Sequence, residues 1–440
     1  MLKSKVFKNA SWIIVCKIVQ SLLSLIVTML TARYLGPSNY GLINYAAAIV
    51  AFVAPIAQLG LGSIQVQELV NYPEEEGVIT GTTLILSLMS AIVCSIGVVS
   101  FAAIANRGEL ETIIVCALYT IVLFFQSAEL MQYWYQAKYI SKYASIVSLI
   151  AFFVITVYKV ILLVKGMGIY WFAIANSIDY IIITFALVFI YHKLGGKKLE
   201  FSWAVAKRML AKSKYYIIAN MMIAIFSQTD RIMLKQMVDS TSTGLYSAAA
   251  TCAGLANFVY VAIVDSFRPM IFESYNKSKE LFKKNTIRLY SIIIYLSIVE
   301  CIVITIFSKL IIRIIYGSVY IDASSALIII AWYTIFAYIG SVRNVWILAN
   351  EKQKWIWQIN LAGAIANVIL NFLLIPFWGI NGAAVASLAT QIFANIIVSY
   401  LIKDIRESSY LMLEGLNPKN IILIIKSMRH WIKGDYCEKD

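Results

Sequence analysis

The chain has 440 residues, of which 61% are hydrophobic and 14% charged, with a mean hydropathy of +0.79. Soluble domains are typically about 45–50% apolar and about 25% charged, so this composition excludes a soluble globular fold and indicates a membrane protein with many spans. The net charge of +14 belongs to basic residues concentrated on one side of the membrane, which favours contact with anionic lipids and excludes a nucleic-acid partner.

Twelve segments have the roughly 20 apolar residues that are needed to cross about 30 Å of hydrocarbon. The sequence therefore predicts an all-α polytopic membrane protein with about 12 transmembrane helices. In chain order the segments run approximately over residues 9–32, 40–64, 78–104, 112–134, 143–164, 168–191, 215–238, 243–266, 286–307, 323–347, 355–377 and 379–402.

The distribution of basic residues predicts the orientation. Most of the 37 Lys and Arg residues fall on the side that carries both termini. By the positive-inside rule both termini are cytoplasmic. One loop on that side, around Glu74, Glu75 and Glu76, has no basic residue. The basic residues on the opposite side are Arg33, Arg107, Lys165, Lys235, Lys309 and Arg313.

Similar motifs recur in the two halves of the chain. The sixth and twelfth segments open alike at Gly168 and Gly379, and the second and eighth at Gly41 and Gly244. An even number of spans per repeat predicts two lobes related by an axis along the membrane normal, with the substrate site between them. The predicted parts are an N-terminal six-helix lobe (1–192), a basic linker (193–214), a C-terminal six-helix lobe (215–403) and a basic amphipathic tail (404–440).

Charged and polar residues within the spans are the candidates for function. A charge at mid-bilayer depth costs about 2.5–3.5 kcal/mol on insertion scales, and such residues normally face protein or a watery cavity. Helical periodicity places weakly polar side chains in stripes, which either line a substrate path or form ordinary helix seams. One stripe on the second span comprises Asn44, Ala48, Ala51, Pro55 and Gln58, and one on the seventh comprises Asn220, Ser227 and Arg231. The candidate substrate-binding residues are Lys17, Arg231, Arg343, Arg33, Ser21, Ser24, Asn44, Gln58 and Ser247.

A second set of charged residues either forms structural ion pairs or carries coupling protons, and the sequence leaves both readings open. Adjacent helical residues such as Asp230 and Arg231 point about 100° apart, so each should meet a different helix. The members of this set are Asp230, Glu129, Lys159, Asp179 and Glu300.

An enzyme is not expected. His192 and His430 lie in basic juxtamembrane segments, and the sequence has no glycine-rich phosphate loop or HExxH motif. The six cysteines show no metal-binding spacing, and no cofactor or metal is predicted.

Three segments resemble signatures of the bacterial polysaccharide-biosynthesis transporters, the oligosaccharide flippases of the multidrug/oligosaccharidyl-lipid/polysaccharide exporter superfamily. They are Thr31 to Ala46 (TARYLGPSNYGLINYA), Asp230 to Ala249 and Tyr316 to Ala323 (YGSVYIDA). The resemblance implies two six-helix lobes in a V, a central cavity bounded by the first, second, seventh and eighth helices, and alternating access. It implies a monomer that moves O-antigen or capsule repeat units on undecaprenyl pyrophosphate, with a polysaccharide polymerase and assembly proteins as further partners.

This substrate suits the residues. Cationic side chains such as Lys17 and Arg231 would bind the pyrophosphate, while hydroxyl and amide stripes would bind the sugar. The alternatives are a drug or small-cation exporter of the same superfamily, or a flippase for another lipid-linked glycan such as teichuronic acid or an exopolysaccharide. A cation exporter should have an acidic cavity, whereas the first helix here carries a lysine.

Overall fold

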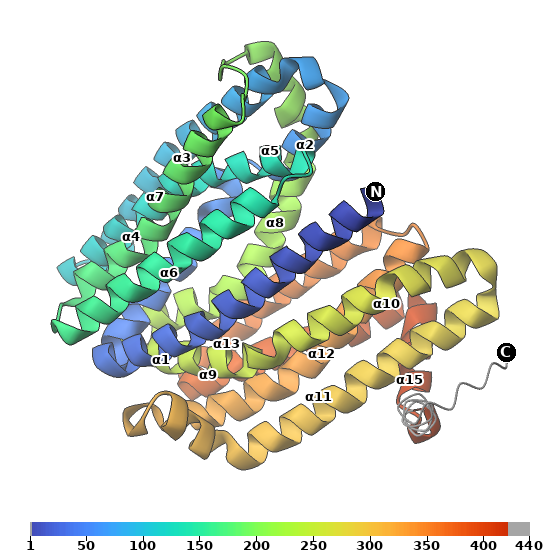
Figure 1. The fold of residues 1–440 in the computed structure, drawn as a ribbon. Helices are drawn as coiled ribbons and strands as arrows, with labels where there is room; N and C mark the ends of the chain where they lie inside the picture. Colours follow the sequence, from blue (N-terminus) through green and yellow to red (C-terminus); the bar gives the residue numbers. More distant parts are fainter. Residues whose placement is uncertain (1, 421–440) are drawn as a thin grey trace. The chain divides into compact units, whose positions relative to one another are not determined.

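The computed structural model describes the backbone of residues 2–420 and the side chains from Leu23 to Asn420. Within this part every regular element is helical, and α- and π-helices alternate with short 3₁₀ turns (Figure 1). The helices are α1 (Leu2–Ala57), α2 (Leu61–Asn71), α3 (Glu76–Ala105), α4 (Leu110–Ala128), α5 (Gln132–Ala137), α6 (Lys142–Val164), α7 (Ile169–Lys193), α8 (Trp203–Met237), α9 (Ser240–Ala253), α10 (Asn257–Lys277), α11 (Lys279–Ile315), α12 (Ala323–Ala349), α13 (Lys354–Ile392), a π-helix (Phe393–Val398), α14 (Ser399–Leu401) and α15 (Arg406–Gly415).

The predicted polytopic all-α fold is confirmed. Ten helical runs in the described residues are long and apolar enough to cross a membrane. Two of them, which contain α1 and α13, are broken at a glycine with non-helical backbone angles, Gly36 (φ 71°) and Gly379 (φ 52°). Positive φ is accessible to glycine at little cost because it has no Cβ. Gly36 falls between the first and second predicted spans and Gly379 at the start of the twelfth, so the ten runs correspond to the twelve spans of the sequence.

The chain divides into two compact units, residues 1–244 and 245–440. In the first unit α3, α4, α6 and α7 lie side by side (Figure 1). Its apolar core has two clusters. One joins α1, α3, α4, α6 and α7 around the buried Tyr45 and Leu123, and the other joins α2, α5 and the start of α8 around Trp134 and Tyr135. In the second unit α11 packs against α10, α12 and α15.

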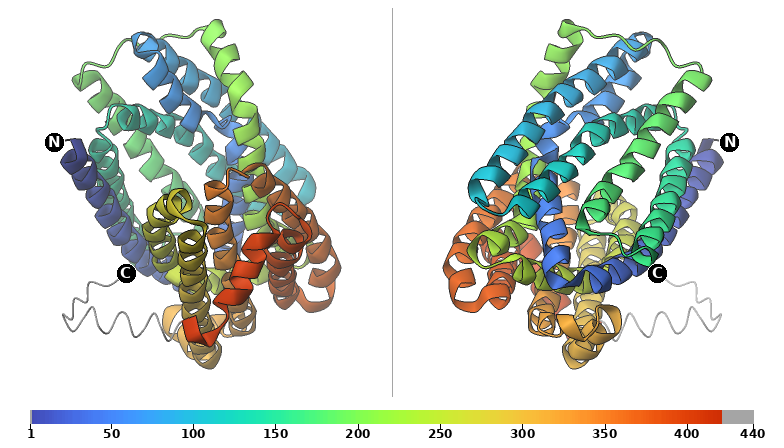
Figure 2. Two further views of the ribbon diagram at one scale, coloured as in Figure 1. Left: turned by 90° about the vertical axis from the view of Figure 1, so that its right-hand side faces the viewer. Right: turned by 90° about the vertical axis from the view of Figure 1, so that its left-hand side faces the viewer.

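The helical part of the predicted linker is the beginning of α8, so it is continuous with the seventh span. The segment before it is extended and passes over the start of α3 (Figure 2). Glu200 N donates to Gly77 O at 3.3 Å, and a Cβ at Gly77 would lie 2.1 Å from Lys198 O. This close approach needs glycine. α8 packs within the first unit, although the prediction assigned its membrane-spanning part to the C-terminal lobe. The predicted lobe boundaries stay a prediction.

The acidic loop that lacked basic residues obtains them from the linker, from α8 and from Lys138, which follows α5. The fully buried Glu68 carboxylate binds Arg208 Nε at 2.7 Å and Lys212 Nζ at 2.6 Å. Arg208 also binds Glu75 at 2.6 Å, and Lys138 binds Glu76 at 2.6 Å. A buried carboxylate is tolerated when it is paired in this way.

The beginnings of the second and eighth spans cross at two glycines. A Cβ at Gly41 would lie 1.8 Å from Ser240 O, and a Cβ at Gly244 would lie 2.0 Å from Pro37 O. Small residues allow membrane helices to approach this closely.

The end of the second unit is held by α15. Tyr290 Oη and Ser408 Oγ share a hydrogen bond of 2.7 Å, and Ser291 Oγ donates to Gly415 O at 2.9 Å. Most of the predicted amphipathic tail, from residue 421 onward, lies outside the described residues.

Candidate functional site

A cavity of about 580 Å³ lies in the first unit, between α1, α4, α7 and α8. Its lining combines small apolar residues with amides, phenols, a hydroxyl and a carboxylate. The polar lining residues are Gln58, Tyr119, Gln126, Asn176, Asp179, Tyr180, Asn220 and Ser227.

Two of the sequence stripes face this cavity. Ala51, Pro55 and Gln58 line it from the first run of helix, and Asn220 and Ser227 line it from α8. These positions follow the helical repeat, so periodicity identified the faces that a tertiary cavity uses. Asn44, which belongs to the same stripe as Gln58, does not line the cavity, and its Nδ2 donates to the helical carbonyl of Tyr40 at 2.8 Å.

The structure brings together three of the predicted charged residues beside the cavity. Lys159 Nζ donates to Asn176 Oδ1 at 2.9 Å. The charge of Asp179 interacts with those of Lys159 and Glu129, and Asp179 and Asn176 both line the cavity. Opposite charges attract strongly away from water, so Lys159 offsets the acidic character that Asp179 gives to the lining.

Asp230 and Arg231 lie one turn beyond the cavity on α8. Arg231 is half-buried, and its Nη1 donates to Ser227 O at 3.3 Å and to Gln228 Oε1 at 3.2 Å. Asp230 is buried. Arg231 is therefore next to a cavity-lining residue, but it is not itself part of the lining.

Of the four candidates on the first span, two have described side chains. Ser24 and Arg33 are exposed. Lys17 and Ser21 lie on α1, and their side chains lie outside the described residues. Whether Lys17 reaches the cavity stays a prediction.

Ser247 and Arg343 lie in the second unit, and both are buried. The Arg343 guanidinium is only 3% exposed. It donates to Asn395 Oδ1 at 3.0 Å, Ser399 Oγ at 2.9 Å and Asn344 Oδ1 at 3.0 Å. Two of these partners lie in or directly after the π-helix. Arg343 therefore belongs to a packed helix seam in this structure.

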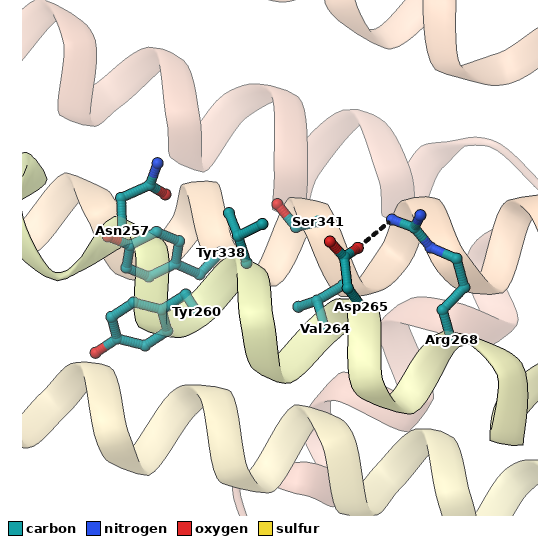
Figure 3. Close-up of a pocket in the computed structure, with 8 residues that line it drawn as sticks. Asn257, Tyr260, Val264, Asp265, Arg268, Tyr338 and Ser341 are labelled. Atoms are coloured by element: carbon teal, nitrogen blue, oxygen red, sulfur yellow. Dashed lines mark ion pairs between the residues drawn. The ribbon is translucent and has the colours of Figure 1, made fainter. Parts of the chain in front are cut away.

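A smaller cavity of about 110 Å³ lies in the second unit, along α10 and α12 (Figure 3). The Tyr260 and Tyr338 rings stack there, with centroids 3.8 Å apart and an interplanar angle of 14°. At its other end Asp265 and Arg268 form an ion pair of 2.9 Å (Figure 3). The predicted residue Glu300 lies close to Tyr260, one of the two stacked rings.

The sequence analysis missed the residues of this smaller cavity. The i,i+3 spacing of Asp265 and Arg268 was the available signal, because residues at this spacing are neighbours on a helix. The tyrosine stack had no such signal, since its two rings come from helices far apart in the sequence.

Residues 6–275 match the family described as polysaccharide biosynthesis protein. The capsular polysaccharide biosynthesis protein CapF of Staphylococcus aureus is 25% identical over 413 residues, which cover 90% of this chain and 99% of CapF. A putative O-antigen transporter of Escherichia coli strain K12 is 22% identical over 428 residues, which cover 92% of this chain and 98% of that protein.

Solved structures of low sequence identity share the fold. The lipid II flippase MurJ, in an inward closed conformation, superposes with a TM-score of 0.72 at 16% identity and covers 91% of this chain and 90% of its own. An inward-facing multidrug resistance transporter of the MATE family in the MOP superfamily gives 0.70 at 12% identity, covering 89% and 95%. The predicted fold is confirmed.

Proposed function

Since the chain belongs to the polysaccharide biosynthesis protein family, a family of multi-pass membrane transporters and not of enzymes, we propose that it is a flippase for lipid-linked oligosaccharides. It moves undecaprenyl-pyrophosphate-linked repeat units, of O-antigen or capsule type, from the cytoplasmic to the outer leaflet by alternating access. Both termini are cytoplasmic in this proposal.

The observation that carries the proposal is the polar cavity of about 580 Å³ among membrane-spanning helices. A glycan on a pyrophosphate cannot cross hydrocarbon unaided, because its polar groups would lose their hydrogen bonds. Gln58, Asn176 and Asn220 offer amide donors and acceptors for sugar hydroxyls. The apolar lipid tail needs no such partners and stays in the bilayer.

The pyrophosphate requires positive charge. Lys17 and Arg231 supply it in the proposed mechanism, from the first and seventh spans, and Arg33 assists at the outer end of the first span. Charge-assisted hydrogen bonds to phosphate oxygens are about twice as strong as neutral ones. Transport itself requires no covalent chemistry and no cofactor.

One observation favours the alternative of a cation exporter, because Asp179 lines the cavity. The neighbouring Lys159 offsets that charge, which makes the hydroxyl-rich glycan of a lipid-linked cargo the better match for this cavity. Accumulation of a cationic dye in cells that lack and cells that carry the protein separates the two functions.

The test replaces cavity amides by apolar side chains of similar size. Gln58→Met with Asn220→Leu should reduce surface polysaccharide several-fold in a strain that depends on this gene, with membrane abundance near normal. Gln136→Met changes an exposed amide that does not line the cavity and is the matched control. Normal export in the double variant would contradict a role of this cavity in glycan transport.

A further inference from the structure

The first unit contains a second polar cavity, of about 570 Å³, at the end that the basic-residue count predicts to be external. It forms where the turn between α3 and α4 meets the end of α8, the start of α9 and the residues that follow Gly36. It shares no lining residue with the cavity of about 580 Å³ on which the proposed function rests.

The floor of this outer cavity is held by a hydrogen-bonded network. Asn106 Nδ2 donates to Tyr45 Oη at 3.1 Å, and Gln236 Nε2 donates to Asn106 Oδ1 at 3.1 Å. Tyr45 and Asn106 are buried. The two amides are therefore fixed in position before any ligand arrives, which lowers the entropy lost on binding.

The charges of the outer cavity are predominantly negative. Lys235, whose side chain is 5% exposed, binds Glu109 at 2.6 Å. This hydrogen bond, together with that from Thr112, holds the pKa of Glu109 below its usual range. Glu111 and Asp239 are exposed and line the same cavity. With Lys235 matched by Glu109, these two carboxylates leave the lining acidic.

This chemistry selects a class of ligand. Sites for drug-like molecules are lined mainly by hydrophobic and aromatic side chains, whereas carboxylates, amides and the hydroxyls of Ser240 and Thr241 dominate here. The carboxylates accept hydrogen bonds from sugar hydroxyls, and the amides and hydroxyls both accept and donate them. An anionic ligand would be repelled by the surplus of carboxylates.

We propose that the outer cavity is a saccharide subsite that receives neutral or amino-bearing sugar units of the cargo and rejects uronic acids. The assignment of the sugar as part of the cargo rests on the proposed flippase function. The subsite gives the glycan a polar environment at the external end of the protein, separate from the positive charges that bind the pyrophosphate.

The test is equilibrium binding to the full-length protein in nanodiscs, measured by calorimetry with three trisaccharides of equal length. One is N-acetylated and neutral, one carries free amines and one consists of uronic acids. The neutral and amino sugars should bind, with the amino sugar at least as tightly, and the uronic sugar should bind at least about tenfold more weakly, a factor that corresponds to about 1.4 kcal/mol. Equal binding of all three, or no binding of any, overturns the proposal.

Two variants locate the binding. Glu111→Gln with Asp239→Asn should remove the preference for the amino sugar while binding of the neutral sugar persists, whereas Glu280→Gln, an exposed carboxylate elsewhere, should change neither. Thr241→Trp fills the exposed rim and should abolish binding of both sugars in protein that remains monodisperse. Unchanged binding in this variant overturns the assignment. Because the readout is binding and not export, loss of the subsite and loss of the flippase function are distinguishable.

Discussion

Lys159 and Arg343 are each a single positive charge in an apolar membrane helix, yet their surroundings differ. Lys159 contacts Asn176, a residue of the cavity lining, and shares its environment with Asp179. Arg343 is enclosed by the side chains of Asn344, Asn395 and Ser399. The same sequence signal thus marks a residue that supports a cavity lining in one unit and a closed helix seam in the other. The partners that packing supplies decide between these outcomes.

The largest effect is expected for Lys17, whose substitution tests whether a charge in a span binds substrate or belongs to a helix seam. If it binds the lipid-linked pyrophosphate, Lys17→Ala should reduce surface polysaccharide by more than about tenfold, because a hydrogen bond to a charged group contributes about 1.5–3 kcal/mol. Membrane abundance, measured by immunoblot, should stay near normal. Lys17→Arg should retain part of the export, since it keeps the charge and changes the donor geometry.

Arg231→Ala is the matching variant on α8. Normal export in the Lys17→Ala, Arg231→Ala double variant would exclude these residues as the anion site. A fall in abundance in parallel with export would instead place Lys17 in a structural seam.

Arg343→Ala should act mainly on stability. It leaves the buried Ser399 and the half-buried Asn344 and Asn395 without their donor, and we expect a loss of about 3 kcal/mol. The measurements are thermal unfolding in detergent and membrane abundance. Arg343→Lys should recover only part, because a single ammonium cannot reproduce the planar fork of donors. If the Arg343→Ala protein is abundant but fails to export glycan, Arg343 has a role in transport and not only in stability.

The smallest effect is expected for the charge group beside the cavity. Asp179→Asn and Lys159→Met should each destabilise the protein, since each single change strands the opposite charge. The double variant should be less destabilised than the sum of the two single effects, with a coupling of about 1 kcal/mol. A double-mutant cycle on the unfolding midpoint measures this. Strict additivity would show that Lys159 and Asp179 do not depend on each other.

Hydropathy and periodicity predicted much of this molecule. The spans followed from the length of apolar runs, and the stripe of Ala51, Pro55 and Gln58 was found because a helix repeats every 3.6 residues. Tyr119 and Tyr180 were not predicted to line the cavity, because no polar stripe was assigned to the fourth or sixth span. These residues are recognised only when separate helices pack together.

The linker shows a second limit of the sequence. Seven basic residues in segment 193–214 predicted contact with anionic lipid, whereas Arg208 and Lys212 bind the buried Glu68. The acidic loop and the basic linker each looked anomalous alone. The pairing of segments this far apart in the chain is a tertiary property. The sequence showed only that one segment has an excess of acidic residues and the other an excess of basic residues.

The glycine crossing bears on the origin of the chain. Gly41 meets the carbonyl of Ser240, and Gly244 meets the carbonyl of Pro37. The separation between Pro37 and Ser240 equals that between Gly41 and Gly244. The two contacts therefore join equivalent positions of the recurring motif, with the roles of glycine and carbonyl exchanged. A reciprocal contact of this kind is the hallmark of an isologous interface in a two-fold homodimer. At this crossing, one continuous polypeptide meets itself as a half-length subunit would meet its twin.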